Sequence, residues 1–253
     1  MSPLSLSSHA LVTGGGRGIG LAVAAALSKA GATVTVIGRN RATLDAAVSS
    51  GAAHFAAVAD VADQASVKSA VAEAAARHPI DVLVANAGAA ESAPFGRSDA
   101  ALFQRMMNVN FMGVVHAAQA VLPGMIERRR GRIVAVASTA ALKGYAYVSA
   151  YSAAKHAVIG LVRSLALETA KSGVTVNAVC PGFTETDLLE GSIDNIIKKT
   201  GRSREQAIAE LSKHNPQGRL DAPSEVADAV LWLCGEGAVS ITGQAIAVAG
   251  GEV

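Results

Sequence analysis

Short apolar runs alternate with longer amphipathic segments along the chain, and this alternation predicts its elements. The short runs are rich in valine, isoleucine and alanine, which is typical of buried strands. The longer segments place apolar residues at helical spacing, and several end at a glycine or before a proline. The predicted strands span residues 9–13, 32–37, 54–58, 80–85, 132–137, 174–179 and 241–248. The predicted helices span residues 19–30, 43–50, 64–77, 99–127, 149–171 and 223–234.

A parallel sheet follows from this alternation, because right-handed strand–helix–strand units build such sheets. We therefore predict one doubly wound α/β domain over residues 1–253, with a seven-stranded parallel sheet and helices on both faces. Hydrophobic residues make up 51% of the chain, which suits a sheet that is buried on both sides. Ligands of such sheets bind beyond the carboxyl ends of the strands. The residues at those ends include Thr13, Asp60, Asn86, Ser138 and Pro181.

The glycine-rich turn after the first strand predicts a site for a dinucleotide pyrophosphate. Gly14 permits the tight turn, Gly18 lets the backbone approach a phosphate, and Gly20 lets helix and strand pack closely. The start of the next helix supplies free N–H groups and a partial positive charge. A flexible turn can have the same composition, but the strand before it and the helix after it favour the binding site. The predicted contacts are Thr13, Gly14, Gly16, Arg17, Gly18, Ile19 and Gly20.

A second candidate site is the pair Tyr151 and Lys155, which lie four residues apart and therefore on one face of a helix. Free tyrosine has a pKa of about 10 and is a poor base at neutral pH. A cation about 4 Å away favours the phenolate by roughly 1 kcal/mol in water and about 4 kcal/mol at an effective dielectric near 20. Lys155 is thus expected to lower the pKa of Tyr151 enough for general acid/base work. The alternative is a surface pair on an amphipathic helix.

The ordered set of motifs resembles the short-chain dehydrogenase/reductase family, a Rossmann-type fold. The resemblance runs from about residue 9 to residue 251, and no catalytic position of the family's pattern is missing. The matching motifs are Thr13-Gly14-x-x-x-Gly18-x-Gly20, Asn86-Ala87-Gly88, Asn110, Ser138, Tyr151-x-x-x-Lys155 and Pro181-Gly182.

The resemblance implies a role for each of these residues. Tyr151 exchanges the substrate proton, Lys155 lowers the pKa of Tyr151 and binds ribose hydroxyls, and Ser138 hydrogen-bonds the substrate oxygen. Asn110 holds a water that relays protons from Lys155. Taken alone, Ser138 could instead cap a turn, and Asn110 could be tied to the backbone of its own helix. The other implied cofactor contacts are Asp60, Val61, Asn86, Ala87, Gly88, Pro181, Gly182 and Thr184.

The end of the second strand favours NADP(H), with NAD(H) as the alternative. An NAD-binding protein of this architecture places an acidic residue there for the ribose hydroxyls. This chain has Gly38 followed by Arg39, and no Asp or Glu occurs before Asp45. Arg39 and Arg17 could form charge-assisted contacts with a 2′-phosphate. They could also be ordinary surface charges.

Bulk properties limit the partners. A net charge of +2 is too small to argue for nucleic acid, and no uninterrupted apolar stretch is long enough to predict a membrane span. The two cysteines suggest a reducing compartment, so a cytoplasmic location is expected. The six histidines show no metal-binding spacing. The resemblance implies a homotetramer through the helices 99–122 and 149–171, which carry apolar residues on more than one side. Val114, Val115, Ala118, Val158 and Leu161 are examples.

The segment 183–220 is too long for a plain connection and predicts a substrate lid. It has an apolar stripe near helical spacing, followed by the five cations Lys198, Lys199, Arg202, Arg204 and Lys213. These features are similar to those of the family's 3-oxoacyl reductases and 3-hydroxyacyl-CoA dehydrogenases, with the cations near the phosphates of a thioester. The alternatives are a simple ketone or cyclic alcohol, a solvated helix face, or a non-catalytic dinucleotide sensor. A nucleotide-sugar epimerase of the family's longer branch is disfavoured by chain length.

Overall fold

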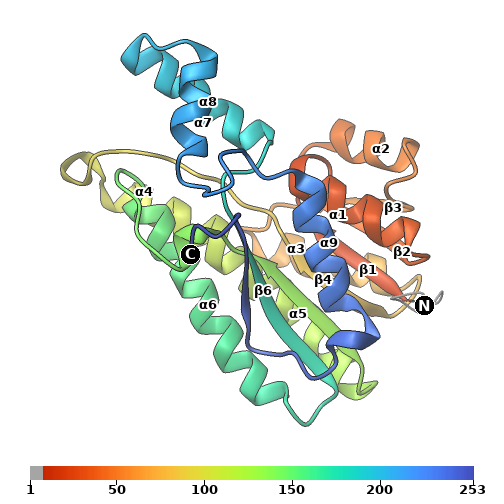
Figure 1. Cartoon of the computed structure of the whole chain (residues 1–253). Helices are drawn as coiled ribbons and strands as arrows, with labels where there is room; N and C mark the ends of the chain where they lie inside the picture. Colours follow the sequence, from red (N-terminus) through yellow and green to blue (C-terminus); the bar gives the residue numbers. More distant parts are fainter. Residues whose placement is uncertain (1–7) are drawn as a thin grey trace.

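The computed structural model describes residues 8–253 and contains a seven-stranded parallel sheet (Figure 1). The strand order is β3-β2-β1-β4-β5-β6-β7, so the direction of winding reverses between β1 and β4. The predicted fold class is therefore confirmed. The strands are β1 (His9–Thr13), β2 (Thr33–Gly38), β3 (Phe55–Val58), β4 (Ile80–Ala85), β5 (Gly131–Val136), β6 (Val174–Pro181) and β7 (Ala245–Val248).

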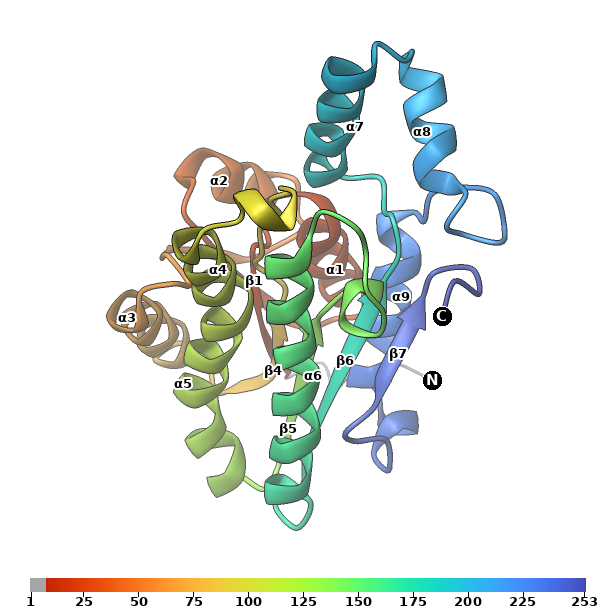
Figure 2. The ribbon, with the colours of Figure 1, turned by 90° about the vertical axis from the view of Figure 1, so that its left-hand side faces the viewer.

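Helices cover both faces of the sheet (Figure 2). The α-helices are α1 (Gly18–Lys29), α2 (Arg41–Ser49), α3 (Gln64–Ala75), α4 (Ala100–Met107), α5 (Gly113–Glu127), α6 (Ser149–Thr169), α7 (Asp187–Thr200), α8 (Arg204–Ser212) and α9 (Pro223–Cys234). Three short 3₁₀ turns also occur, η1 (Phe95–Arg97), η3 (Thr139–Ala141) and η4 (Glu236–Ala238). One core contains buried residues of α3, α5 and α6, and the other those of α1, α2 and α9. Side chains alternate across the sheet, because Leu11 enters the first core while Ala10 and Val12 enter the second.

The helix predicted over residues 99–127 is interrupted at residues 108–112 and not at Pro123. A π-helical segment, η2 (Asn108–Met112), separates α4 from α5, whereas α5 continues past Pro123 to Glu127. A proline within a helix removes one backbone hydrogen bond. Here the helix is held on both sides of it, because Val121 and Met125 are buried in the core. Pro123 therefore does not end the helix.

The last strand is shorter than predicted, since residues 241–244 form a turn before β7. Gly243 has a φ of +72°, and its N–H donates to the carbonyl of Val176 at 2.7 Å. Thr242 Oγ1 accepts from the N–H of Val176 at 3.0 Å. The turn thus satisfies backbone groups of β6 without extending the ladder.

The continuous segment Ala100–Glu127 is long and apolar enough, by length and composition, to cross a membrane. It meets this criterion on a mean hydropathy of 1.4 rather than as an uninterrupted apolar run, since Arg105 lies within it. A core helix of a globular domain meets the same criterion. Ala117, Val121 and Met125 of this segment pack in the core against the sheet, which accounts for its hydrophobicity.

Candidate active site

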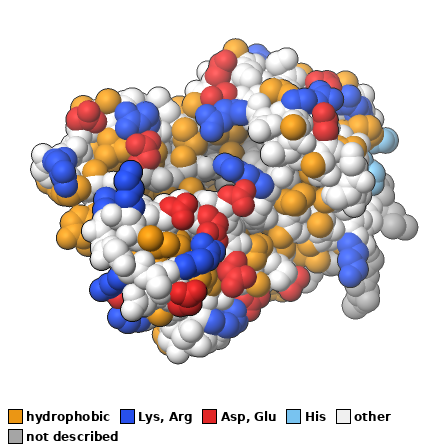
Figure 3. All heavy atoms as spheres, turned by 90° about the horizontal axis from the view of Figure 1, so that it is seen from above, with side chains coloured by type: hydrophobic (Ala, Val, Ile, Leu, Met, Phe, Trp, Pro, Cys, Tyr) orange, Lys and Arg blue, Asp and Glu red, His pale blue; other side chains and the backbone are white. Residues whose placement is uncertain are grey.

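One large cavity of about 1480 Å³ opens at the carboxyl ends of the strands. The space-filling view from above looks onto this end of the molecule, where charged side chains of both signs surround a hollowed surface (Figure 3). Nearly all of the predicted site residues face this cavity. They are Gly14, Gly16, Arg17, Gly18, Ile19, Arg39, Asp60, Val61, Asn86, Ala87, Gly88, Asn110, Ser138, Tyr151, Lys155, Pro181, Gly182 and Thr184.

Two predicted cofactor contacts, Thr13 and Gly20, lie behind the wall of the cavity. Thr13 Oγ1 accepts hydrogen bonds from the N–H groups of Asn86 and Ala87, both at 3.0 Å. Gly20 leaves no room for a side chain, because a Cβ there would meet the carbonyl oxygen of Gly14. These residues hold the loops after β1 and β4 together and so shape the cavity from behind.

The glycine-rich turn has the backbone geometry that its sequence predicts. Gly14 and Gly18 have φ values of +66° and +53°, in the left-handed region that favours glycine. The start of α1, with Gly18 and Ile19, faces the cavity. Free N–H groups at a helix start bind anions, so this end of the cavity fits the pyrophosphate of a dinucleotide.

Three arginines, Arg17, Arg39 and Arg41, line the cavity, and two of them, Arg39 and Arg41, follow the carboxyl end of β2. Arg41 forms an ion pair with Asp45 at 2.9 Å, and Arg17 lies 3.6 Å from Asp187. Arg39 has no ion pair within residues 8–253. A cation that the protein does not neutralise is suited to a ligand phosphate, and Arg39 is therefore available for such a contact.

Tyr151 and Lys155 come from the first turns of α6 and face the same cavity. Lys155 is only 4% exposed, and its Nζ donates to the carbonyl of Val136 at 2.9 Å. The same Nζ lies 5.7 Å from the centroid of the Tyr151 ring. Burial lowers the pKa of Lys155 to about 8. The two side chains are brought together as predicted, which excludes a solvated surface pair.

The expected lowering of the Tyr151 pKa by Lys155 is wrong for this structure. Burial raises the pKa of Tyr151 above that of free tyrosine, and a hydrogen bond with Ser138 opposes this without reversing it. A buried phenolate lacks solvent stabilisation, and the ammonium of Lys155 is engaged with a backbone carbonyl. The phenol therefore keeps its proton at neutral pH and is set to donate it.

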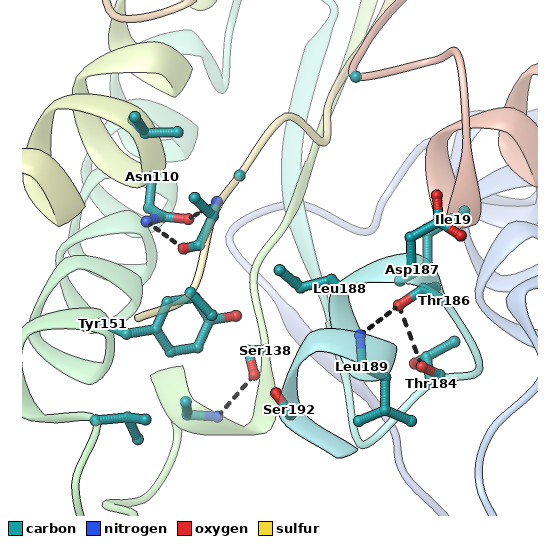
Figure 4. A pocket seen from close by; sticks show the side chains of 18 of the residues that line it. Ile19, Asn110, Ser138, Tyr151, Thr184, Thr186, Asp187, Leu188, Leu189 and Ser192 are labelled. Carbon is teal, nitrogen blue, oxygen red and sulfur yellow. Dashed lines mark hydrogen bonds between the residues drawn. The ribbon is translucent and has the colours of Figure 1, made fainter. Parts of the chain in front are cut away.

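Ser138 and Asn110 both show the structural contacts that were considered as alternatives (Figure 4). Ser138 Oγ accepts from the N–H of Ala140 at 3.1 Å and so caps a turn, and it lines the same cavity as Tyr151. Asn110 is fully buried in the π-helical segment. Its Nδ2 donates to the carbonyls of Ala89 and Met106, and its Oδ1 accepts from the N–H of Ala89. The role of Asn110 in holding a water stays a prediction.

An aromatic cluster that the sequence pattern did not reveal lies at the substrate end of the cavity. The rings of Tyr145, Phe183 and His214 have centroids 5.4–6.0 Å apart, and all three line the cavity. Tyr145 lies between Ser138 and Tyr151 in the sequence, in a loop that must pass close to both. That position was the available signal. Phe183 and His214 come together only through the path of 183–220.

Three of the five cations named above are neutralised within the segment 183–220. Arg204 forms an ion pair with Glu190 at 2.6 Å, and Arg202 and Lys213 both bind Glu210. The expectation that all five cations are available to substrate phosphates is therefore wrong. Lys199 lines the cavity and, like Lys198, has no ion pair within residues 8–253.

Comparisons with known proteins agree with this geometry over nearly the whole chain. A family model for short chain dehydrogenases matches residues 8–197. A protein of Streptomyces coelicolor assigned as a ketoacyl reductase is 38% identical, with 97% of both chains covered. An acetoacetyl-CoA reductase of Shinella zoogloeoides is 35% identical, with 98% of this chain and 99% of that protein covered.

The fold is also shared with solved structures. A variant of the actinorhodin polyketide ketoreductase, solved with NADPH, superposes with a TM-score of 0.93 at 36% identity and covers 97% of each chain. The family model and these identities, together with the glycine turn and the tyrosine–lysine pair in one cavity, identify the chain as an oxidoreductase that uses a nicotinamide dinucleotide. It belongs to the short-chain dehydrogenase/reductase family.

Proposed function

We propose that this protein is an NADP(H)-preferring reductase that converts a ketone to a secondary alcohol, with a 3-oxoacyl thioester as substrate. The observation that carries the proposal is the meeting of Ser138, Tyr151 and Lys155 in the cavity that the glycine-rich turn also lines. A non-catalytic dinucleotide sensor needs no proton donor, so this arrangement favours an enzyme.

The residues of this chain supply position and a proton, while the bound nicotinamide supplies the hydride. Reduction places negative charge on the carbonyl oxygen, and the hydroxyls of Ser138 and Tyr151 stabilise it. Tyr151 transfers its phenolic proton to that oxygen. Lys155 binds the ribose hydroxyls and keeps a positive charge beside the phenolate that remains. Asn110 holds the loop after β4 through its hydrogen bonds with Ala89. It also positions a water that relays protons from Lys155.

Residues 183–220 serve as the substrate lid of a single catalytic domain. The pair of helices α7 and α8 projects beyond the carboxyl edge of the sheet (Figures 1 and 2). Leu189, Ile193 and Leu211 form a small core within the pair. Leu188, Leu189 and Ser192 line the cavity on the lid side (Figure 4). The apolar lining suits an acyl chain, and the names of the two relatives support a ketoacyl substrate.

The thioester is expected to be the better substrate by a modest factor. Acetoacetyl-CoA is compared with its free ketone analogue, with NADPH, at low and raised salt. An exposed lysine contributes about 0.2–1 kcal/mol to such a contact, so we expect a thioester advantage in kcat/KM of about fivefold from Lys199. The advantage should shrink as salt screens the charge. Lys199→Ala should remove it, whereas the matched control Lys198→Ala, outside the cavity lining, should keep it.

Two outcomes of this experiment count against the proposal in different ways. Turnover of the free ketone with an equal kcat/KM would leave a ketoreductase with a plain hydrophobic lid, acting on a simple ketone or cyclic alcohol. NADPH binding without hydride transfer to any ketone of a panel would support the dinucleotide sensor instead.

A cytoplasmic homotetramer is the proposed form of the protein. Of the residues considered for the interface, Val114, Ala118 and Val158 are buried in the core. At exposed positions of α5 and α6, Ile126 is 43% and Leu167 is 82% exposed. Exposed apolar side chains on neighbouring helices suit a symmetric contact. Light scattering at micromolar concentration should therefore give four times the chain mass, and Leu167→Glu should lower it. A single monomer-sized species for the unmodified chain contradicts the proposal.

A further inference from the structure

The penultimate residue, Glu252, is folded back into the interior. Gly250 and Gly251 have φ values of +58° and +95° and turn the chain after β7. The side chain of Glu252 is 1% exposed as a result. Burying a carboxylate is costly unless its charge is paired and hydrogen-bonded. The contacts that hold Glu252 therefore indicate what this segment is built to do.

One oxygen of Glu252 holds the loop that connects η3 to α6. Oε1 accepts from the hydroxyl of Tyr145 at 2.5 Å and from Nζ of Lys143 at 3.0 Å. Nζ of Lys143 also donates to the backbone carbonyl of Glu252 at 3.4 Å. His214 Nδ1 lies 3.8 Å from the same Oε1. The other oxygen, Oε2, has no hydrogen-bond partner within residues 8–253 and faces Gly182.

Tyr145 joins this buried carboxylate to the candidate active site. Its hydroxyl is also 2.6 Å from Oγ1 of Thr139, the residue after Ser138. Its ring packs edge-on against Phe183 and His214, with centroids 6.0 and 5.6 Å away. Burial and the hydrogen bond to Glu252 raise the pKa of Tyr145, so the phenol remains a hydrogen-bond donor at physiological pH.

We propose that Glu252 is a positioning residue that determines substrate specificity by clamping Tyr145, and with it the aromatic wall of the substrate end. The inference rests on the proposed ketone reduction at this cavity. A carbonyl held by Ser138 and Tyr151 presents its larger substituent to one side, and the wall formed by Tyr145, Phe183 and His214 accepts or rejects that substituent. A wall that is fixed selects one face of the ketone for hydride transfer, whereas a loose wall admits both.

The test compares Glu252→Ala, Glu252→Gln, Tyr145→Phe and the double variant Tyr145→Phe/Glu252→Ala, with Glu236→Ala as the exposed control. For Glu252→Ala we expect a tenfold rise in KM for the ketone, a kcat within threefold, and a loss of enantiomeric purity in the alcohol. The Kd of NADPH should not change. Glu252→Gln keeps an acceptor for the Tyr145 hydroxyl, so its KM should rise less, and its alcohol product should keep more enantiomeric purity, than in Glu252→Ala. The KM of the double variant should not exceed that of the single variant with the higher KM, because both changes break the same hydrogen bond between Tyr145 and Glu252.

If Glu252 has only a structural role, Glu252→Ala should lower Tm and leave KM and the enantiomeric purity of the alcohol unchanged. That result would overturn the proposal. Ultraviolet titration of the tyrosines reads the clamp without any turnover. Phenolate formation by Tyr145 should begin at lower pH in Glu252→Ala, and this component is identified by its absence in Tyr145→Phe. An unchanged titration overturns the clamp even in an active enzyme. If the unmodified protein reduces no ketone, the proposed function fails, whereas a shifted titration still supports the clamp.

Discussion

Replacing Tyr151 by phenylalanine is expected to lower kcat for ketone reduction by about 100- to 10,000-fold, the usual effect of losing a general acid. The ring is retained, so the cavity keeps its shape. The pKa of Tyr151 is raised by burial, which keeps the proton on the phenol at neutral pH. Steady-state kinetics with NADPH and a ketone measure the loss, and the Kd of NADPH should stay nearly unchanged.

Tyr147→Phe is the matched control for this substitution. Tyr147 lines the same cavity, is 66% exposed, and makes no side-chain hydrogen bond within residues 8–253. Its loss of a hydroxyl should leave kcat within a few-fold of the unmodified enzyme. If Tyr151→Phe keeps most of its turnover, the proton comes from elsewhere and the assignment of Tyr151 is wrong.

The strands and helices could be predicted because apolar side chains repeat with the period of each element. The alternation of short valine-rich runs and amphipathic segments reproduces the sheet and the two helical layers. The π-helical segment around Asn110 could not be predicted, because its hydrophobic pattern continues that of α4 and α5. What distinguishes it is the pair of hydrogen bonds between Asn110 and Ala89, a residue that is distant in sequence.

In the candidate site, too, the features set by neighbouring residues in the sequence could be predicted, whereas those set by tertiary contacts could not. The glycine turn and the tyrosine–lysine pair are local patterns, and the carboxyl ends of parallel strands bring them to one cavity. The direction of the Tyr151 pKa depends on how deeply the phenol is buried, which spacing along a helix does not reveal. The aromatic wall needs residues 145, 183 and 214, and the ion pairs that neutralise the lid need Glu190 and Glu210. These contacts depend on tertiary packing.

The double variant Gly38→Asp/Arg39→Leu is expected to reverse the cofactor preference from NADPH to NADH. A hydrogen bond to a charged group contributes about 1.5–3 kcal/mol, so loss of the Arg39 contact should weaken NADPH binding by ten- to 100-fold. The new carboxylate repels the 2′-phosphate and accepts hydrogen bonds from the ribose hydroxyls of NADH. Position 38 tolerates the side chain, because a Cβ there would lie 3.4 Å from Cδ2 of Leu44, an ordinary contact.

The measurement is the ratio of kcat/KM for NADPH to that for NADH, with the same ketone, for the unmodified chain and the variants. Arg97→Leu is the control, because Arg97 also lines the cavity but lies away from the end of β2. It should leave the ratio unchanged. Arg39→Leu alone should lower the ratio without reversing it, since NADH gains no new contact. Tighter binding of NADH than of NADPH by the unmodified protein would refute the preference, and Arg39 would then be an ordinary surface charge.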